Sequence, residues 1–276
     1  QQQQQQQQQQ HKLEFVHIPK TGGTAIEIIA ARHNITFGMC HFTTNEKPYG
    51  KKLCGHLPDG MQYRYPEIQI FARCPWWHMP PVYVMSSFPN HNPYGLDVDL
   101  FTVVRNPYER MISDYYYWSN MRKNTKNWES DEVKFNNEIN KRLTSFSKNH
   151  FRNSATGHMI PQYDFVYNNT NIDVDEGNNF RTTNATSANT AATKMEKKKL
   201  IKNVLRFEFL GKEFQTLMEL YNLPMLVLPN QTIGGTTSNN KVLDIHNLTN
   251  ENMVLIETIY QNDFLEFGYE MLSSRQ

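Results

Sequence analysis

The sequence predicts a single α/β domain in which a parallel sheet is flanked by helices. Short apolar segments alternate with helical patterns along the chain, which is typical of parallel sheets. The segment at residues 100–104, LFTVV, is continuous in β-branched and apolar residues, as expected of a strand covered on both faces. Residues 15–27, FVHIPKTGGTAIE, have the order of strand, glycine-rich turn and helix that is found in phosphate-binding loops.

The first predicted unit is a strand at residues 13–18 followed by a helix at residues 24–33. The strand is a short apolar run, and the helix has its apolar residues on one face. Prolines concentrate between residues 48 and 93. We therefore expect loops and short strands in that stretch, as an insertion that helps to form a site.

The second predicted unit begins with the strand at residues 100–104 and continues into a helix. Asn106 suits the N-cap, Pro107 suits the first helical position, and Glu109 stands where a carboxylate is expected to reach back to the cap. Arg105 is therefore expected at the carboxyl end of a strand, directly before a helix.

The rest of the chain continues this alternation, with one irregular interruption. Residues 168–193 are rich in Asn, Thr, Ser and Ala without periodicity, which indicates a flexible excursion rather than a domain boundary. The other predicted elements are a helix at 129–150, a strand at 163–167, a strand at 204–210, a helix at 212–221, a strand at 225–228, a loop at 229–241 and a final helix from about Thr249.

The charge balance excludes two classes of partner. Lys plus Arg number 28 and Asp plus Glu number 27 in 276 residues, so no global field favours nucleic acid or an anionic membrane surface. Residues 1–12 begin with ten glutamines and are expected to be disordered, which leaves residues 13–276 as the domain. The sequence has no apolar run of about 18 residues, so any membrane anchor is expected upstream.

The cysteines and the glycosylation acceptors carry little information about chemistry. The three cysteines form neither a C-x-x-C pair nor a metal-ligand cluster with nearby histidines, so no zinc site is predicted. Asn-x-Ser/Thr acceptors, about three of which are expected by chance, occur at Asn34, Asn168, Asn184, Asn230 and Asn247. They are compatible with a glycoprotein but do not demand one.

The turn between the first strand and its helix carries the groups that an anion requires. Gly22 and Gly23 let the backbone come close to the anion, and the amides near Thr24 point at it with the helix dipole behind them. Lys20 adds a charge, and the threonines at 21 and 24 add hydroxyl donors. The G-x-x-x-x-G-K-[ST] spacing of a nucleotide-hydrolysing loop is missing, so the sequence raises the question of which anion is bound.

The start of the second helix offers another anion site. The planar guanidinium of Arg105 suits bidentate phosphate binding, and Ser113 lies two helical turns further along. In parallel sheets, ligands bind beyond the carboxyl ends of the strands, where both Lys20 and Arg105 are expected. Two anion sites at two strand ends imply a ligand with two separate anionic groups.

These two motifs resemble those of Golgi-type carbohydrate sulfotransferases, which use 3′-phosphoadenosine 5′-phosphosulfate (PAPS). FVHIPKTGGTAIE is similar to their 5′-phosphosulfate-binding loop, and FTVVRNPYERMISDYYY is similar to their 3′-phosphate-binding segment. The resemblance covers most of residues 13–272 and implies a P-loop NTPase-like fold. It assigns Lys20, Thr21, Gly22, Gly23 and Thr24 to the 5′-phosphosulfate, and Arg105 and Ser113 to the 3′-phosphate.

Sulfuryl transfer needs a base for the acceptor hydroxyl and a cation for the leaving phosphate oxygen. Lys20 is the candidate cation. The family uses a histidine or a carboxylate as the base, and two histidines compete for this role. His78 lies 27 residues before Arg105, at the separation usual in the family, beside two tryptophans that can stack on a sugar. His56 lies 49 residues before Arg105, in a Gly-His-x-Pro pattern. We favour His78, and both stay candidates.

The resemblance also implies the partners and the location of the protein. We expect PAPS as the donor, without a metal, and a glycan or glycoconjugate as the acceptor. We also expect the protein to lie in the Golgi lumen as a type II membrane protein whose anchor is not in this chain. The acceptor sugar and the oligomeric state stay open. One alternative is a P-loop nucleotide kinase or ATPase, against which the missing loop spacing and Arg105 in place of a carboxylate argue. The other is a catalytically inactive glycan-binding protein, against which the intact motifs argue.

Overall fold

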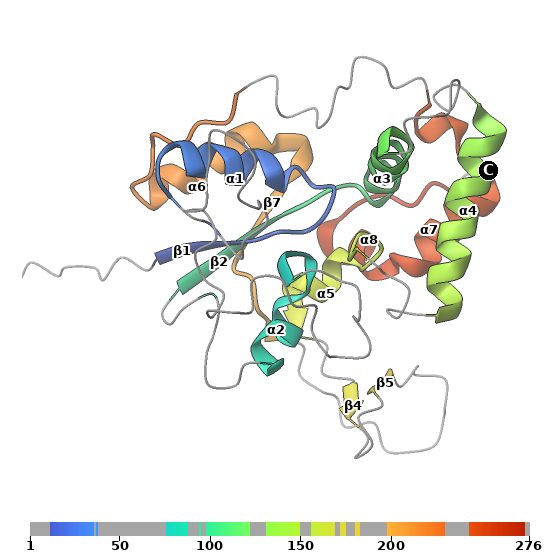
Figure 1. Ribbon diagram of the computed structural model, residues 1–276, viewed down its shortest axis with the longest axis horizontal. Helices are drawn as coiled ribbons and strands as arrows, with labels where there is room; N and C mark the ends of the chain where they lie inside the picture. Colours follow the sequence, from blue (N-terminus) through green and yellow to red (C-terminus); the bar gives the residue numbers. More distant parts are fainter. Residues whose placement is uncertain are drawn as a thin grey trace, which may run out of the picture.

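A sheet of three parallel strands, in the order β1, β2, β7, forms the centre of the molecule (Figure 1). The strands are β1 Lys12–Val16, β2 Val98–Val104 and β7 Asn203–Arg206. Their carboxyl ends share one edge, because Val16 lies opposite Thr102 and Val104 opposite Arg206. The structure is a computed structural model that describes residues 12–35, 37, 76–87, 94, 98–121, 131–149, 156–168, 172–174, 180–182, 198–229 and 243–273.

Two helices, α1 (Gly23–Arg32) and α6 (Leu210–Leu220), cover one face of this sheet. They lie together above the strands in Figure 1. Phe15, Phe101 and Leu205 point to this face and share a buried core with both helices. Successive side chains of a strand point to opposite faces, so every second strand residue contributes to this core.

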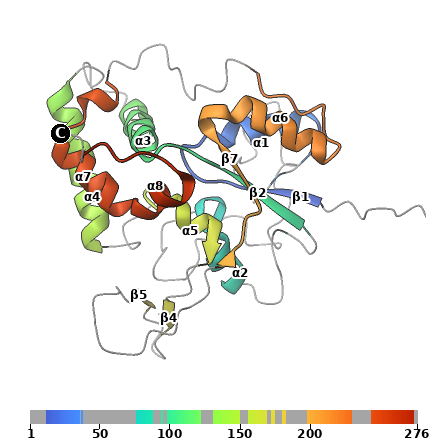
Figure 2. The same ribbon diagram turned by 180° about the vertical axis from the view of Figure 1, so that it is seen from behind.

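The opposite face is covered by three shorter helices, which contact the remaining strand residues. Val16, Leu100 and Val104 belong to this second core. The helices are α2 Pro81–Ser87, α5 Gln162–Val166 and α8 Gln261–Phe267. Figure 2 shows α2 and α5 on the side of the sheet away from α1 and α6. The predicted α/β fold, with helices on both faces of a parallel sheet, is confirmed.

A third core lies beyond the carboxyl ends of β1 and β2, where three longer helices pack together (Figure 1). These are α3 Pro107–Met121, α4 Glu132–Asn149 and α7 Asn250–Ile259. Tyr115 and Tyr116 are buried in this core. Much of the aromatic run on α3 therefore serves packing.

The start of α3 differs from the prediction in one detail. Asn106 caps the helix as expected, since its Oδ1 accepts a hydrogen bond from the amide of Tyr108 at 3.0 Å. Glu109, however, does not reach back to the cap. The amide of Asn106 donates instead to Glu208, at 2.8 Å, and Glu109 pairs with Arg105. A carboxylate from a distant segment completes the cap and frees Glu109 for the arginine.

The prediction of a strand at residues 163–167 is wrong, because most of this segment forms α5. Asp263 on α8 accepts hydrogen bonds from the amides of Gln162 and Tyr163, at 3.0 and 2.7 Å. A carboxylate in this position stabilises the start of a helix. The aromatic and apolar residues of YDFVY suit a strand, but this distant carboxylate favours the helix.

Two further strand predictions also need correction. The strand predicted at 204–210 ends at Arg206 and continues as a 3-10 turn, η5, at Phe207–Phe209. Residues 225–228 form no strand in the described part of the chain. Leu226 and Leu228 are buried whereas Met225 and Val227 are exposed, so the alternation of a strand is present without a partner strand.

The remaining elements are short. The described residues include two antiparallel pairs, and the second lies within the stretch predicted as a flexible excursion: β3 Tyr167–Asn168 with β6 Lys198–Lys199, and β4 Ile172–Val174 with β5 Phe180–Thr182. Two more 3-10 turns are η3 Trp76–His78 and η7 Ile245–Asn247. The glutamine tract, the three cysteines and the loop at 229–241 lie almost entirely outside the described residues, and the domain limits stay a prediction. None of the described helices is long and apolar enough to cross a membrane.

Candidate functional site

The loop between β1 and α1 has two residues in the left-handed region of backbone conformation and is stabilised by a hydrogen bond within the loop. Lys20 has a φ of 70° and Gly22 a φ of 89°, both in the left-handed region. A Cβ at Gly22 would lie 3.0 Å from the ring of Phe207, so glycine is required there by both conformation and space. The buried hydroxyl of Thr21 donates to the carbonyl of Ile18 at 2.8 Å. Thr21 thus supports the loop, and its predicted contact with a nucleotide stays a prediction.

The amino end of α1 opens onto this loop. Gly22 is the N-cap and has no side chain to accept hydrogen bonds from the first amides of the helix. Gly23 is buried at the start of the helix, and Thr24 is exposed next to it. The first amides of a helix need an acceptor, and the helix dipole makes an anion a favourable one. The loop is therefore suited to hold an anionic group in front of α1.

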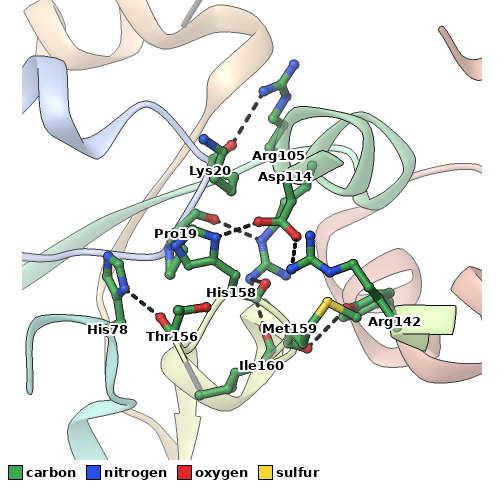
Figure 3. A network of polar contacts seen from close by, with 12 residues as sticks. Pro19, Lys20, His78, Arg105, Asp114, Arg142, Thr156, His158, Met159 and Ile160 are labelled. Carbon is green, nitrogen blue, oxygen red and sulfur yellow. Dashed lines mark hydrogen bonds and ion pairs between the residues drawn. The ribbon is translucent and has the colours of Figure 1, made fainter. Parts of the chain in front are cut away.

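Arg105 is brought to this loop by the end of β2. Arg105 is only 7% exposed, and Nη1 of its side chain donates to the carbonyl oxygen of Lys20 at 3.4 Å (Figure 3). Nη2 pairs with Glu109 at 3.1 Å, and the guanidinium lies 4.3 Å from the ring centroid of Phe207. The buried Nε has no hydrogen-bond partner in the described structure.

Burial lowers the pKa of Arg105 from its ordinary value, and Glu109 and Glu208 oppose this shift. Glu109 compensates the charge, but a buried donor without an acceptor is still costly. The orphaned Nε therefore points to an anionic ligand beside Arg105.

The main chain of Arg105 is clamped by Gln162. The amide of Arg105 donates to Oε1 of Gln162 at 2.8 Å, and Nε2 of Gln162 donates to the carbonyl of Arg105 at 2.9 Å. Nε2 also donates to Asp263 at 3.1 Å. Gln162 is fully buried, so its role is to fix the strand end from which the arginine extends.

Ser113 lies on the face of α3 that contacts the loop. Arg110 and Tyr117, three residues before it and four after it, share its helix face. Arg110 donates to the carbonyl of Pro19 at 3.0 Å, and the ring of Tyr117 lies 4.4 Å from Nζ of Lys20. Ser113 is buried between these two positions. The predicted set of Lys20, Arg105 and Ser113 is thus gathered around one loop.

His78 comes from η3, far from the two anion loops in sequence. Its Nδ1 lies 2.7 Å from the carbonyl oxygen of Thr156 (Figure 3). A carbonyl oxygen only accepts, so Nδ1 carries the proton, and the lone pair of the neutral ring lies on Nε2. This is the tautomer that a general base requires. Trp77 contacts the ring of His78 edge-on, and the competing candidate His56 lies outside the described residues.

A buried pair of His158 and Asp114 stands next to His78. Nδ1 of His158 lies 2.5 Å from Asp114, and Arg142 pairs with the same carboxylate at 2.6 Å (Figure 3). Burial raises the pKa of Asp114, but His158 and Arg142 outweigh this effect and lower it. Burial lowers the pKa of His158, against the attraction of Asp114, and the charge of Lys20 adds to the lowering. We therefore take Asp114 as ionised and His158 as a neutral donor.

The sequence profile of the sulfotransferase family matches residues 6–270, which is nearly the whole chain. This chain belongs to the sulfotransferase family. The family confirms the resemblance noted from the two motifs and agrees with the three-stranded parallel sheet and its flanking helices. Neither the curated proteins nor the solved structures gave a significant match.

The family implies PAPS as the donor, and the residues present in this sulfotransferase fit it. PAPS carries a phosphosulfate at one end of its ribose and a phosphate at the other. The helix that follows the loop of Lys20 begins without a side-chain cap, and Arg105 has an orphaned, buried Nε. These two cationic features meet where Arg105 contacts the Lys20 carbonyl, as a ligand with two anionic groups requires. The expectation that no metal takes part stays a prediction.

Three residues of the candidate site were not singled out from the sequence: His17, Arg110 and Asp114. Arg110 had one available signal, because it falls five residues after Arg105 on a helix already assigned to the site. The other two are recognised only by their contacts with distant segments.

Proposed function

We propose that this sulfotransferase transfers a sulfuryl group from PAPS to a carbohydrate hydroxyl, with His78 as the general base. The observation that carries the proposal is the buried guanidinium of Arg105, which has an unpartnered Nε and contacts the Lys20 loop. The family supports sulfuryl transfer from PAPS. The carbohydrate acceptor rests on the resemblance of the motifs, and the base rests on the tautomer of His78.

The proposed roles follow from the position of each group. The amides at the start of α1 and the charge of Lys20 hold the 5′-phosphosulfate, and Arg105 with Ser113 holds the 3′-phosphate. When bound, PAPS supplies the sulfuryl group and a phosphate leaving group. His78 accepts the proton of the attacking hydroxyl on Nε2 while Thr156 holds Nδ1–H. Lys20 and the dipole of α1 offset the negative charge that develops beside the loop.

The proposal extends to the partners and the location expected from the motifs. A glycan or glycoconjugate is the acceptor, and the Golgi lumen is the compartment, with any anchor upstream of this chain. The kinase or ATPase alternative loses support because the family match covers both loops. An inactive glycan-binding protein would not need the buried cation of Arg105 or the base-ready tautomer of His78.

Transfer of radiolabelled sulfate from PAPS to a panel of desulfated glycans tests this function. We expect label on at least one glycan and none on a tyrosine-containing peptide. Thermal unfolding in 3′-phosphoadenosine 5′-phosphate (PAP) and in ATP with Mg²⁺ gives a second readout, with stabilisation by PAP alone expected. Stabilisation by ATP with Mg²⁺ but not by PAP would support the kinase alternative. Stabilisation by glycan but not by nucleotide would support the inactive protein.

A further inference from the structure

His17 has no role in the mechanism above, yet it lies at the joint between the anion loop and the proposed base. It follows β1 directly and is buried. Its ring centroid is 5.2 Å from that of His78, and the centroid of His78 is 5.2 Å from that of His158. Three histidines from three distant segments therefore form one row, with His78 in the middle.

Each end of this row is tied to a carboxylate. Nδ1 of His17 lies 2.8 Å from Oε1 of Glu27, a buried residue of α1. Nδ1 of His158 lies 2.5 Å from Asp114 on α3. The central ring is held differently, because Nδ1 of His78 faces the carbonyl of Thr156. When His78 takes up a proton, the negative charges that stabilise its imidazolium are therefore those of Glu27 and Asp114, which contact the two neighbouring histidines.

The ring of His17 is fixed by the anion loop itself. A Cβ on Gly23 would lie 2.9 Å from both Cε1 and Nδ1 of His17, so glycine at the start of α1 makes room for this ring. Glu27 stands one helical turn later on the same helix. The first turns of α1 therefore face the proposed anion site on one side and orient His17 on the other.

The charged and titratable groups that surround the row come from several described elements. Besides the three histidines they are Glu27 of α1, Lys20 of the loop, Asp114, Arg110 and Tyr117 of α3, and Arg142 of α4. The cations Lys20, Arg110 and Arg142 lie toward the His158 end. The carboxylate of Glu27 at the other end is thus the negative charge best placed to act on His78 from the side of α1.

We propose that the His17–Glu27 pair positions His78 against the anion loop and increases the proton affinity of its ring. This role rests on the proposed function of His78 as the base. The contact between the rings is not a hydrogen bond, so no proton passes along the row. His17 acts by packing and Glu27 by its charge, and both are positioning residues.

Two substitutions of Glu27 separate its charge from its hydrogen bond. Glu27→Gln keeps an oxygen that accepts from Nδ1–H of His17 but removes the charge. Glu27→Leu removes both. Glu257→Gln is the matched control, because Glu257 is equally buried, at 9% exposure, and contacts Tyr108 and Ser273 in another core. The titration of the Cε1–H signals by ¹H–¹³C NMR, in the protein without nucleotide, reads the ring of His78 directly. The signal is assigned by its loss in His78→Gln.

We expect the titration midpoint of His78 to fall by about 0.5 pH unit or more in Glu27→Gln, because a nearby negative charge is lost. The acidic limb of the kcat profile should move to lower pH by the same amount, with the affinity for PAP unchanged within about twofold. Glu27→Leu should lower kcat by about tenfold or more at unchanged PAP affinity. An unchanged midpoint in Glu27→Gln, or an equal shift in Glu257→Gln, would overturn the proposal.

The same measurements distinguish this proposal from the proposed function. If His78→Gln keeps full turnover, His78 is not the base, and the NMR titration still supports or overturns the coupling to Glu27. If His78→Gln is inactive while Glu27→Gln leaves the titration of His78 unchanged, His78 is still supported as the base. The positioning role of the His17–Glu27 pair is then contradicted. If Glu27→Leu does not fold, the titration of Glu27→Gln decides alone.

Discussion

Arg105 donates a hydrogen bond from Nη1 to the main-chain carbonyl oxygen of Lys20, so the end of β2 is joined directly to the loop after β1. The two predicted anion-binding motifs, which are far apart in sequence, therefore lie together. They are held by buried groups that contact their main chain, such as Gln162 and Arg110. The predictions below separate the groups that bind, react and support.

Gln162 supports Arg105, and its loss should weaken the nucleotide site without removing a ligand contact. Gln162→Leu leaves the amide and the carbonyl of Arg105 buried without these partners. We expect a loss of about 1–3 kcal/mol in the free energy of unfolding and weaker PAP binding in the folded fraction, measured by urea denaturation and calorimetry. Equal PAP affinity in Gln162→Leu and the wild type would contradict this role.

His78 should be needed for turnover and not for nucleotide binding. His78→Gln is expected to lower kcat by about 100-fold or more, because proton transfer by a positioned base contributes this much, with PAP affinity unchanged. His56→Ala tests the competing candidate in the same assay. The matched control is His33→Gln, because His33 is exposed after the end of α1. Loss of turnover in His56→Ala with full activity in His78→Gln would move the base to His56.

Replacing Gly22 should weaken nucleotide binding by the loop in addition to destabilising the protein. Gly22→Ala places a side chain at a φ of 89° and within 3.0 Å of Phe207. We expect a cost of about 1–3 kcal/mol in the free energy of unfolding and at least a tenfold loss of PAP affinity. Gly268→Ala is the control, because Gly268 also has a positive φ, of 65°, at the end of α8. It should destabilise the protein and leave PAP affinity intact. Equal effects of both variants on affinity would show that the loop geometry is not specific.

Asp164 should make the protein less stable as the pH rises from about 4 to about 7. Burial, together with the neighbouring Asp263, raises the pKa of Asp164 to about 7. The folded state then binds more protons than the unfolded state between pH 4 and pH 7, so the free energy of unfolding falls as pH rises through this window. Asp164→Asn should therefore gain about 2–3 kcal/mol relative to the wild type as the pH rises from 5 to 8, measured by denaturation at each pH. A difference between Asp164→Asn and the wild type that stays constant over this pH range would contradict the raised pKa.

The strands and the helix start that carry Lys20 and Arg105 could largely be predicted from local sequence. Continuous apolar runs and a proline at the first helical position predicted β1, β2 and the start of α3, so Lys20 and Arg105 were expected at strand ends. Two glycines in the turn predicted its close backbone approach, and Gly22 does adopt a positive φ. These features depend on neighbouring residues, which a sequence shows.

The support of the site could not be predicted, because it depends on contacts between distant residues. Asp263 turns YDFVY into a helix from about a hundred residues away, and Glu208 replaces Glu109 at the cap of α3. The row of His17, His78 and His158 joins three segments whose spacing carries no common signal. Such pairings follow from the fold and become visible only with it.

Calorimetric titration of PAP and adenosine 5′-monophosphate into the wild type and Arg105→Ala tests most directly whether Arg105 binds the 3′-phosphate of the nucleotide. The two ligands differ only in the 3′-phosphate. The wild type is predicted to bind PAP at least about tenfold more tightly than the monophosphate, because a charge-assisted contact contributes about 1.5–3 kcal/mol. Arg105→Ala should bind both ligands with similar, weak affinity. Equal affinity of the wild type for both ligands, or an undiminished preference for PAP in Arg105→Ala, would contradict the assignment of this site.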